Sequence, residues 1–134
     1  MSGLADIPTN AISFSFGDSP ELADELLALV LAGKKTATCG ALRDYGADGE
    51  PMPEIGRRDI VRDGAGRPAA IIETTHLSQH RFDEVPEAFA LAEGEGDYAE
   101  WRAGHIAYFS RNGGWSPDLM LVCERFKLVE VLER

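Results

Sequence analysis

Residues 12–38 read ISFSFGDSPELADELLALVLAGKKTAT, which predicts a strand, a helix and a loop in immediate succession. Apolar residues alternate with serines at the start, as in a strand with one buried face. Ser19 is then a suitable N-cap for a helix that has Pro20 at its first position. Leucines and valines recur at helical spacing after Pro20 and give one apolar stripe. Gly33 is expected to end this helix and to open the loop.

Outside this stretch, strands and helices lack the regular strand–helix–strand order of a doubly wound sheet. Residues 40–58 are rich in glycine, proline and charge, and they predict an irregular loop. Further strands are expected at 59–62, 68–75 and 118–132, a hairpin turn at 63–66, and helices at 85–91 and from 98 to about 110. The pattern indicates one α+β domain over residues 1–134, and a small β-barrel flanked by helices fits it.

The acidic composition of the chain narrows the classes of ligand. The sequence has 13 Lys and Arg residues against 23 Asp and Glu residues, so the formal net charge is −10. Proteins that bind along a nucleic acid need a basic surface, because counterion release drives that association. The same charge disfavours a membrane surface rich in anionic lipid. A small ligand that is neutral or cationic is therefore favoured, and no membrane partner is expected.

Cysteine content and the N-terminal sequence indicate a cytoplasmic protein. The chain has two cysteines, Cys39 and Cys123, and no CxxC pair, so it has no pattern of zinc ligands. Two reduced thiols are the simpler interpretation, and a single disulfide stays open. Residues 1–14 lack the basic and apolar regions of a secretion signal, and no segment has the roughly 20 apolar residues of a membrane span.

The first candidate site is the segment 33–38, GKKTAT, at the end of the first helix. Lys35 and Thr38 are three residues apart, so on a regular strand their side chains face opposite sides. They meet only if the chain turns or bulges near Lys35. The alternative interpretation is a solvated basic helix end, where lysine suits the helix dipole.

The second candidate site is the segment 93–97, EGEGD, which sets three carboxylates among two glycines. Asp97 forms a capping-box pattern with Glu100 and is expected to cap the next helix. Glu93 and Glu95 are left without such a role. Crowded carboxylates raise one another's pKa, which suits a general acid or base, and they are also ligands for Mg²⁺.

The histidines give weaker signals. His76 and His80 have the spacing of metal ligands on a helix, but their segment is predicted as the end of a strand, so no metal is assigned to them. His105 follows Trp101 by four residues on a predicted helix and is interpreted as the packing partner of that tryptophan. The sequence has no GxSxG motif, so nothing local supports a serine nucleophile.

The chain resembles the ASCH domain family in five motifs that follow one another in order. They are FSFGD at 14–18, GxKxxT at 33–38, EGEGD at 93–97, WRxxH at 101–105 and VCERF at 122–126. The resemblance covers residues 12–131 and implies a PUA-like β-barrel, with the GxKxxT segment beside a cleft. It also implies one of three activities that are linked to members of this family: hydrolysis of N4-acylated cytosine nucleosides, RNA binding, or metal-assisted RNA cleavage.

The resemblance further implies which residues act. In the hydrolase-type members the functional set is a Lys, a Thr three residues later and a Glu before the last helix, which correspond here to Lys35, Thr38 and Glu95. Glu93 is the nearest rival for the glutamate. Such members carry an Arg two residues after the Thr, whereas this chain has Gly40 there.

Arg43 is the nearest basic residue that would replace this missing arginine. The expected substrate-binding residues are Thr36, Arg43, Tyr45 and Glu93. No metal and no other cofactor are expected, and the protein is expected to be a monomer or a weak dimer.

The favoured function is hydrolysis of the N4-acyl amide of modified cytosine nucleosides, to give cytidine and a carboxylic acid. Two mechanisms stay open. In one, Thr38 attacks the amide while Lys35, with a pKa lowered by burial, acts as its base. In the other, Glu95 activates water and Lys35 stabilises the oxyanion.

The alternative function is that of an RNA-binding protein or a divalent-metal-dependent ribonuclease acting on single-stranded RNA. Lys34, Lys35 and Arg43 would then contact phosphate, and the EGEGD carboxylates would hold the metal ion. Tyr45 or Trp115 would stack a base. A third possibility is a non-catalytic sensor of a modified nucleobase.

Overall fold

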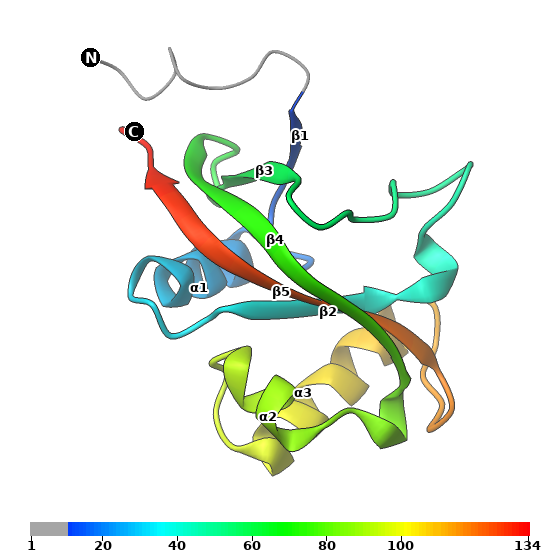
Figure 1. Ribbon diagram of the computed structural model, residues 1–134. Coiled ribbons are helices and arrows are strands. Elements are labelled where there is room, and N and C mark those ends of the chain that lie inside the picture. The colour runs from blue at the N-terminus through cyan, green and yellow to red at the C-terminus, as the bar shows by residue number, and fades with distance from the viewer. Residues whose placement is uncertain (1–10) are drawn as a thin grey trace.

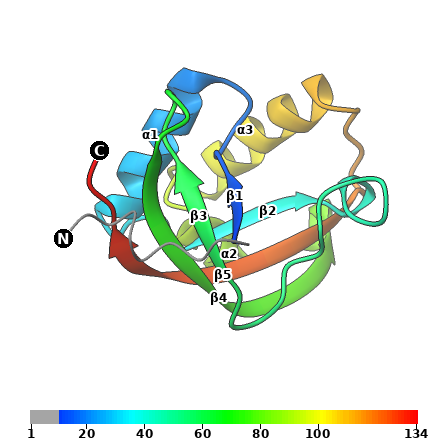
Figure 2. The same ribbon diagram turned by 90° about the horizontal axis from the view of Figure 1, so that it is seen from above.

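A five-stranded mixed sheet forms the centre of the protein in a computed structural model that describes residues 11–134 (Figure 1). The strands lie in the order β1-β3-β4-β5-β2, with β1 parallel to β3 and all other neighbours antiparallel. They are β1 Ile12–Phe14, β2 Ala37–Ala41, β3 Arg58–Arg62, β4 Pro68–Arg81 and β5 Met120–Val131. The sheet curls into a half-barrel, as the view from above shows (Figure 2). The predicted α+β architecture is therefore confirmed.

The two long strands β4 and β5 give the sheet its curvature. Their pairing shifts register between Ile71 and Ile72 and again between Thr74 and His76. Such irregularities bend a strand and increase its twist, so a single strand serves two differently oriented parts of a barrel. The sequence pattern predicts an end at residue 75, but β4 continues to Arg81 because its second half pairs with the start of β5.

Helix α1, Pro20–Leu31, covers one part of the half-barrel. Its start is as predicted, because Ser19 caps it and accepts a hydrogen bond from the backbone N–H of Leu22 at 3.2 Å. Its buried face packs in a core of apolar residues from β1, β3, β4 and β5. That core contains Phe16, Leu26, Leu27, Val30, Val61, Ala69, Ala70, Ile72 and Phe126.

Helices α2, Glu87–Ala92, and α3, Tyr98–Arg111, pack together beside β2 and the first half of β5 (Figure 1). Asp97 caps α3 and forms the predicted capping box with Glu100. A second core lies between these helices and the sheet, and its largest members are Phe82, Phe89, Trp101, Phe109 and Leu121. The segment 93–97 joins the two helices, so this packing fixes where both of its glutamates lie.

The remaining expectations are met in outline. The loop at 40–58 is largely irregular, but β2 extends into it as far as Ala41 and a short 3-10 turn follows at Leu42–Asp44. The expectation that the N terminus carries no secretion signal concerns mainly residues 1–10, which lie outside the described residues. Among residues 11–134, no helix is both long enough and apolar enough to cross a membrane.

Candidate active site

Lys35 lies in the loop between α1 and β2, and its side chain is almost completely buried, with 2% of the residue exposed. The loop is held by the carbonyl of Leu29, which accepts hydrogen bonds from the backbone N–H groups of Lys34 and Lys35 at 2.9 and 3.1 Å. Gly33 has φ +76°, the left-handed conformation that turns the chain out of a helix. The turn predicted near Lys35 is thus present, and Lys35 is not a solvated helix end.

Two carboxylates bind the ammonium group of Lys35. Its Nζ lies 3.0 Å from Oε1 of Glu93 and 3.2 Å from Oε2 of Glu95. Gly94 between them has φ +77°, and a Cβ atom there would lie 2.5 Å from the carbonyl oxygen of Lys34. Only glycine therefore lets the EGEGD segment pass close enough to the lysine loop for both glutamates to reach the same ammonium.

Glu93 is the centre of a buried hydrogen-bond network. Its Oε2 accepts a hydrogen bond from the indole N–H of Trp101 at 3.0 Å and lies 3.6 Å from Nε2 of His105. Nδ1 of His105 lies 2.8 Å from the carbonyl oxygen of Trp101 and must carry the proton, because a carbonyl only accepts. His105 also stacks on Trp101, with ring centroids 4.5 Å apart, as predicted.

The charged groups of this cluster shift the pKa values of Lys35 and Glu95. Burial lowers the pKa of Lys35, but the carboxylates of Glu93 and Glu95 outweigh it, so this pKa lies above its usual range. Burial raises the pKa of Glu95, and the nearby charge of Glu93 adds to the shift. The idea that burial turns Lys35 into a base is therefore wrong for this arrangement: Lys35 is held as an ammonium ion, and Glu95 is the group whose pKa moves towards neutrality.

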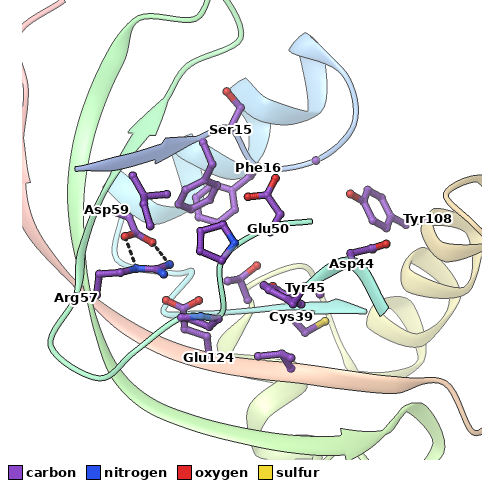
Figure 3. A pocket seen from close by; sticks show the side chains of 18 residues that line it. Ser15, Phe16, Cys39, Asp44, Tyr45, Glu50, Arg57, Asp59, Tyr108 and Glu124 are labelled. Atoms are coloured by element: carbon purple, nitrogen blue, oxygen red, sulfur yellow. Dashed lines mark hydrogen bonds and ion pairs between the residues drawn. The ribbon is translucent and has the colours of Figure 1, made fainter. Parts of the chain in front are cut away.

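Thr38 lies on β2 and lines a cleft that has two adjoining chambers. We call the first the lysine chamber; it measures about 310 Å³ and contains Lys35, Glu93, Glu95 and His105. We call the second the barrel chamber; it measures about 320 Å³ and lies inside the curled sheet (Figure 3). The residues that line both chambers are Phe16, Gly17, Thr38, Cys39 and Tyr108. Thr38 thus lies where the two chambers meet.

The structure brings together Lys35, Thr38, Glu93 and Glu95 around the lysine chamber, and it places Tyr45 in the barrel chamber. The Tyr45 hydroxyl fills the space next to Gly40, where a Cβ atom would lie only 2.6 Å from it. Tyr45, from the loop that follows β2, thus occupies the space beside Gly40.

Thr36 and Arg43 lie outside both chambers, which corrects the expectation that they bind substrate. Thr36 is exposed, and its hydroxyl donates a hydrogen bond to the carbonyl of Ala92 at 3.4 Å. The guanidinium of Arg43 donates to the carbonyl of Gly114 at 2.6 Å. Arg43 lies outside the chambers because it belongs to the 3-10 turn that follows β2. In this turn its side chain points to the loop after α3.

Five charged residues of the barrel chamber have no role assigned to them by the sequence analysis: Asp44, Glu50, Arg57, Asp59 and Glu124. Asp59 is buried and binds the Arg57 guanidinium through two hydrogen bonds of 2.8 Å, which Figure 3 shows. Alternation along β5 places Glu124 on the opposite face of the strand from Cys123, but the sequence alone does not show which strand lies beside it.

One set of side chains has metal-ligand character. Atoms of Cys39, Glu93 and His105 lie within 4.8 Å of one another. However, Glu93 already accepts hydrogen bonds from Lys35 and Trp101, and a divalent cation would sit beside the Lys35 ammonium. The cluster therefore fits a hydrogen-bonded carboxylate better than a metal centre.

Comparison with known proteins shows the family. The model of the ASCH domain matches residues 12–130. The structure superimposes on protein EF3133 from Enterococcus faecalis V583 with a TM-score of 0.83 and 36% identity, over 94% of this chain and 80% of that one. It superimposes on an ASCH domain from Lactobacillus crispatus JV V101 with a TM-score of 0.82 and 32% identity, over 93% and 87% of the two chains.

A more distant likeness concerns the fold alone. ASCH from Zymomonas mobilis has 13% identity and a TM-score of 0.53, over 92% of this chain and 71% of that one. No curated protein matches the chain. The curled mixed sheet with flanking helices is the PUA-like fold of these domains. With the family model matching nearly its whole length, this chain belongs to the ASCH domain family.

Proposed function

We propose that the protein is a hydrolase that cleaves the N4-acyl amide of modified cytosine nucleosides, giving cytidine and a carboxylic acid. The observation that carries the proposal is the contact between the buried Lys35 ammonium and Glu95, at 3.2 Å, in a cleft large enough for a small ligand. Such a pair supplies both a positive charge for a developing oxyanion and a carboxylate for proton transfer.

The electrostatics favour Glu95 as the base. Glu95 accepts a proton from water as the water oxygen attacks the acyl carbon, and the Lys35 ammonium stabilises the negative charge that forms on the carbonyl oxygen. When the intermediate collapses, the bond between the acyl carbon and N4 breaks, and Glu95 returns the proton to N4. The raised pKa of Glu95 suits both transfers, since a base works best with a pKa nearer to the operating pH.

Thr38 has a positioning role in this scheme. Among the described residues, its hydroxyl forms no hydrogen bond with Lys35, Glu93 or Glu95, so no base is aligned to activate it. A threonine hydroxyl is a weak nucleophile without such a base. Its place between the two chambers suits a hydrogen bond to the bound amide.

The alternative, binding or cleavage of RNA, is less well supported. The basic residues that line the two chambers are Lys35, Arg57 and Arg111, and each is paired with a carboxylate within the described residues. Phosphate contacts need cations that are free to release counterions, and the net charge of −10 opposes the approach of a polyanion. A neutral nucleoside avoids both problems.

The experiment is to incubate purified protein with N4-acetylcytidine in EDTA and to follow the ultraviolet spectrum of the base. The wild type is expected to form cytidine, and Glu95→Gln is expected to form none. Glu25→Gln, on the exposed side of α1, is the matched control and should keep full activity. If the wild type forms no cytidine, with or without added divalent metal, the proposed function is wrong. Cleavage of single-stranded RNA would then favour the alternative.

A further inference from the structure

Glu124 is the polar residue of the barrel chamber that lies closest in the sheet to Thr38. The two residues are direct cross-strand partners of β2 and β5, and both line the barrel chamber. Directly opposite side chains on one face of an antiparallel pair have Cβ atoms about 4.5–5.5 Å apart. The carboxyl group of Glu124 is therefore next to the junction where the amide of the substrate would lie.

The carboxyl group has one oxygen engaged and one available. Oε2 accepts a hydrogen bond from the hydroxyl of Thr74, a buried residue of β4, at 2.5 Å. Oε1 has no hydrogen-bond partner among the described residues, and Glu124 is one of the residues that line the chamber (Figure 3). Thr74 thus fixes the orientation of the carboxyl group, and it leaves Oε1 and the second lone pair of Oε2 for a ligand.

The surroundings of this carboxyl group raise its pKa above the ordinary range of a glutamate. Burial raises the pKa of Glu124, and the nearby Asp59 carboxylate adds to the shift. The hydrogen bond from Thr74 and the charge of Arg57 act in the opposite direction but do not cancel it. Arg57 does not pair directly with Glu124, because its guanidinium is bound to Asp59 and to the carbonyl of Met52.

A protonated carboxyl group both donates and accepts, so it matches a heterocycle edge that presents a ring nitrogen beside an exocyclic N–H. N4-acylcytosine has that edge in N3 and N4–H when its acyl group is turned away from N3. The remainder of the chamber suits a flat ring, since Phe14, Phe16 and Tyr45 line it.

We propose that Glu124 is a specificity-determining residue whose carboxyl group pairs with N3 and N4–H of an acylated cytosine held in the barrel chamber. The acyl group then lies in the lysine chamber beside Lys35 and Glu95, and the amide bond lies over Thr38. This assignment rests on the proposed hydrolase function. It predicts that acylated amines with a ring nitrogen beside the amino group, as in cytosine and 2-aminopyridine, are preferred over simple anilides.

Two variants test whether Glu124 pairs with the substrate. Glu124→Gln keeps a donor and an acceptor in the same places, so KM for N4-acetylcytidine should stay within about threefold of wild type. Glu124→Ala removes both, and a bidentate pair of this kind accounts for about tenfold to a hundredfold in KM. Glu130→Ala, farther along β5 and outside both chambers, is the matched control and should leave KM unchanged.

A pair of isomeric substrates tests the edge itself. The wild type should favour 2-acetamidopyridine, which has the ring nitrogen beside the amide, over 4-acetamidopyridine, which does not. Glu124→Ala should lose this preference while its melting temperature stays close to that of Glu124→Gln. Equal KM values for wild type and Glu124→Ala, or a preference that survives in Glu124→Ala, would overturn the assignment and leave the hydrolase function intact.

Binding measured by calorimetry distinguishes this failure from failure of the proposed function. In the Glu95→Gln background, N4-acetylcytidine should bind, and adding Glu124→Ala should weaken that binding by the same factor as KM. If the wild type binds N4-acetylcytidine through Glu124 but never hydrolyses it, the assignment of Glu124 stands and the hydrolase function fails. If the wild type does not bind N4-acetylcytidine at all, both are wrong.

Discussion

Glu93 and Glu95 bind the same ammonium group, but the side chain of Glu93 is 1% exposed and that of Glu95 is 26% exposed. Glu93 is further held by Trp101 and His105, whereas Lys35 is the only hydrogen-bond partner of the Glu95 side chain among the described residues. The buried carboxylate of Glu93 therefore holds Lys35 in place, and the more exposed carboxylate of Glu95 is accessible from the lysine chamber.

This difference in burial predicts losses of stability of different size for substitutions at the two glutamates. Glu93→Ala leaves the Lys35 ammonium buried with one carboxylate fewer, and breaking a buried ion pair costs about 3–5 kcal/mol of unfolding free energy. Glu95→Gln affects a partly exposed pair, so its cost is expected to be about 1 kcal/mol or less. Urea denaturation of both variants measures the difference. Equal losses of stability would mean that Glu95 is as structural as Glu93.

The pH dependence of hydrolysis tests which group is the base. Glu95 must be ionised to accept a proton, and its pKa is raised above the ordinary value of 4.5, so kcat/KM should rise with pH from the acid side of neutrality. The pKa of Lys35 is raised above 10.5, so no fall in kcat/KM is expected at moderately alkaline pH. If Lys35 acted as a neutral base, the activity would instead keep rising to strongly alkaline pH.

The modification state of Thr38 during turnover shows whether water or the Thr38 hydroxyl attacks the acyl carbon. If water is the nucleophile, no acyl group becomes attached to the chain during turnover. Mass spectrometry of protein quenched in the presence of N4-acetylcytidine should then show only the unmodified mass. Thr38→Ser should retain most of the activity, and Thr38→Val should lower it by about tenfold through loss of one hydrogen bond. An acetylated Thr38 would contradict the proposed mechanism.

Much of the local structure follows from short-range chemistry and was predictable. Ser19, Pro20 and the Asp97 capping box mark helix starts because they satisfy backbone N–H groups that the helix leaves unpaired. The partnership of Lys35 with the EGEGD segment was not predictable from spacing, because 58 residues separate Lys35 from Glu93. The resemblance to the ASCH domain family identified both Lys35 and Glu95 as functional residues. Only the fold shows that Glu93 is the more deeply buried partner of Lys35.

Arg43 and Glu124 show why other parts of the site could not be predicted from the sequence. Arg43 is near Gly40 in sequence, which suggested that it replaces the missing arginine, but a 3-10 turn directs its side chain to the carbonyl of Gly114 instead. Glu124 was visible only as part of a motif, because its role depends on the register that pairs it with Thr38. Register between distant strands is a tertiary property, and a shift of one residue would turn Glu124 away from the cleft.

His105 predicts how the stability of the fold changes with pH. Burial alone would lower the pKa of His105, but the Glu93 carboxylate, 3.6 Å from its Nε2, and the charge of Glu95 raise it above 6.5. A raised pKa means that the folded state binds the proton more tightly than the unfolded state. The resulting stabilisation is complete below pH 6.5 and is lost as the pH rises through the pKa of the folded state. The melting temperature of the wild type should therefore fall over that range.

Two histidine variants show whether this fall in melting temperature comes from His105. His105→Gln has no imidazole to titrate beside Glu93, so its melting temperature should change less with pH than that of the wild type. His80→Gln removes a histidine on β4 whose ring forms a hydrogen bond only with Ser78 among the described residues, and it should keep the wild-type slope. A wild-type slope in His105→Gln as well would show that His105 does not pair with Glu93 in its charged form.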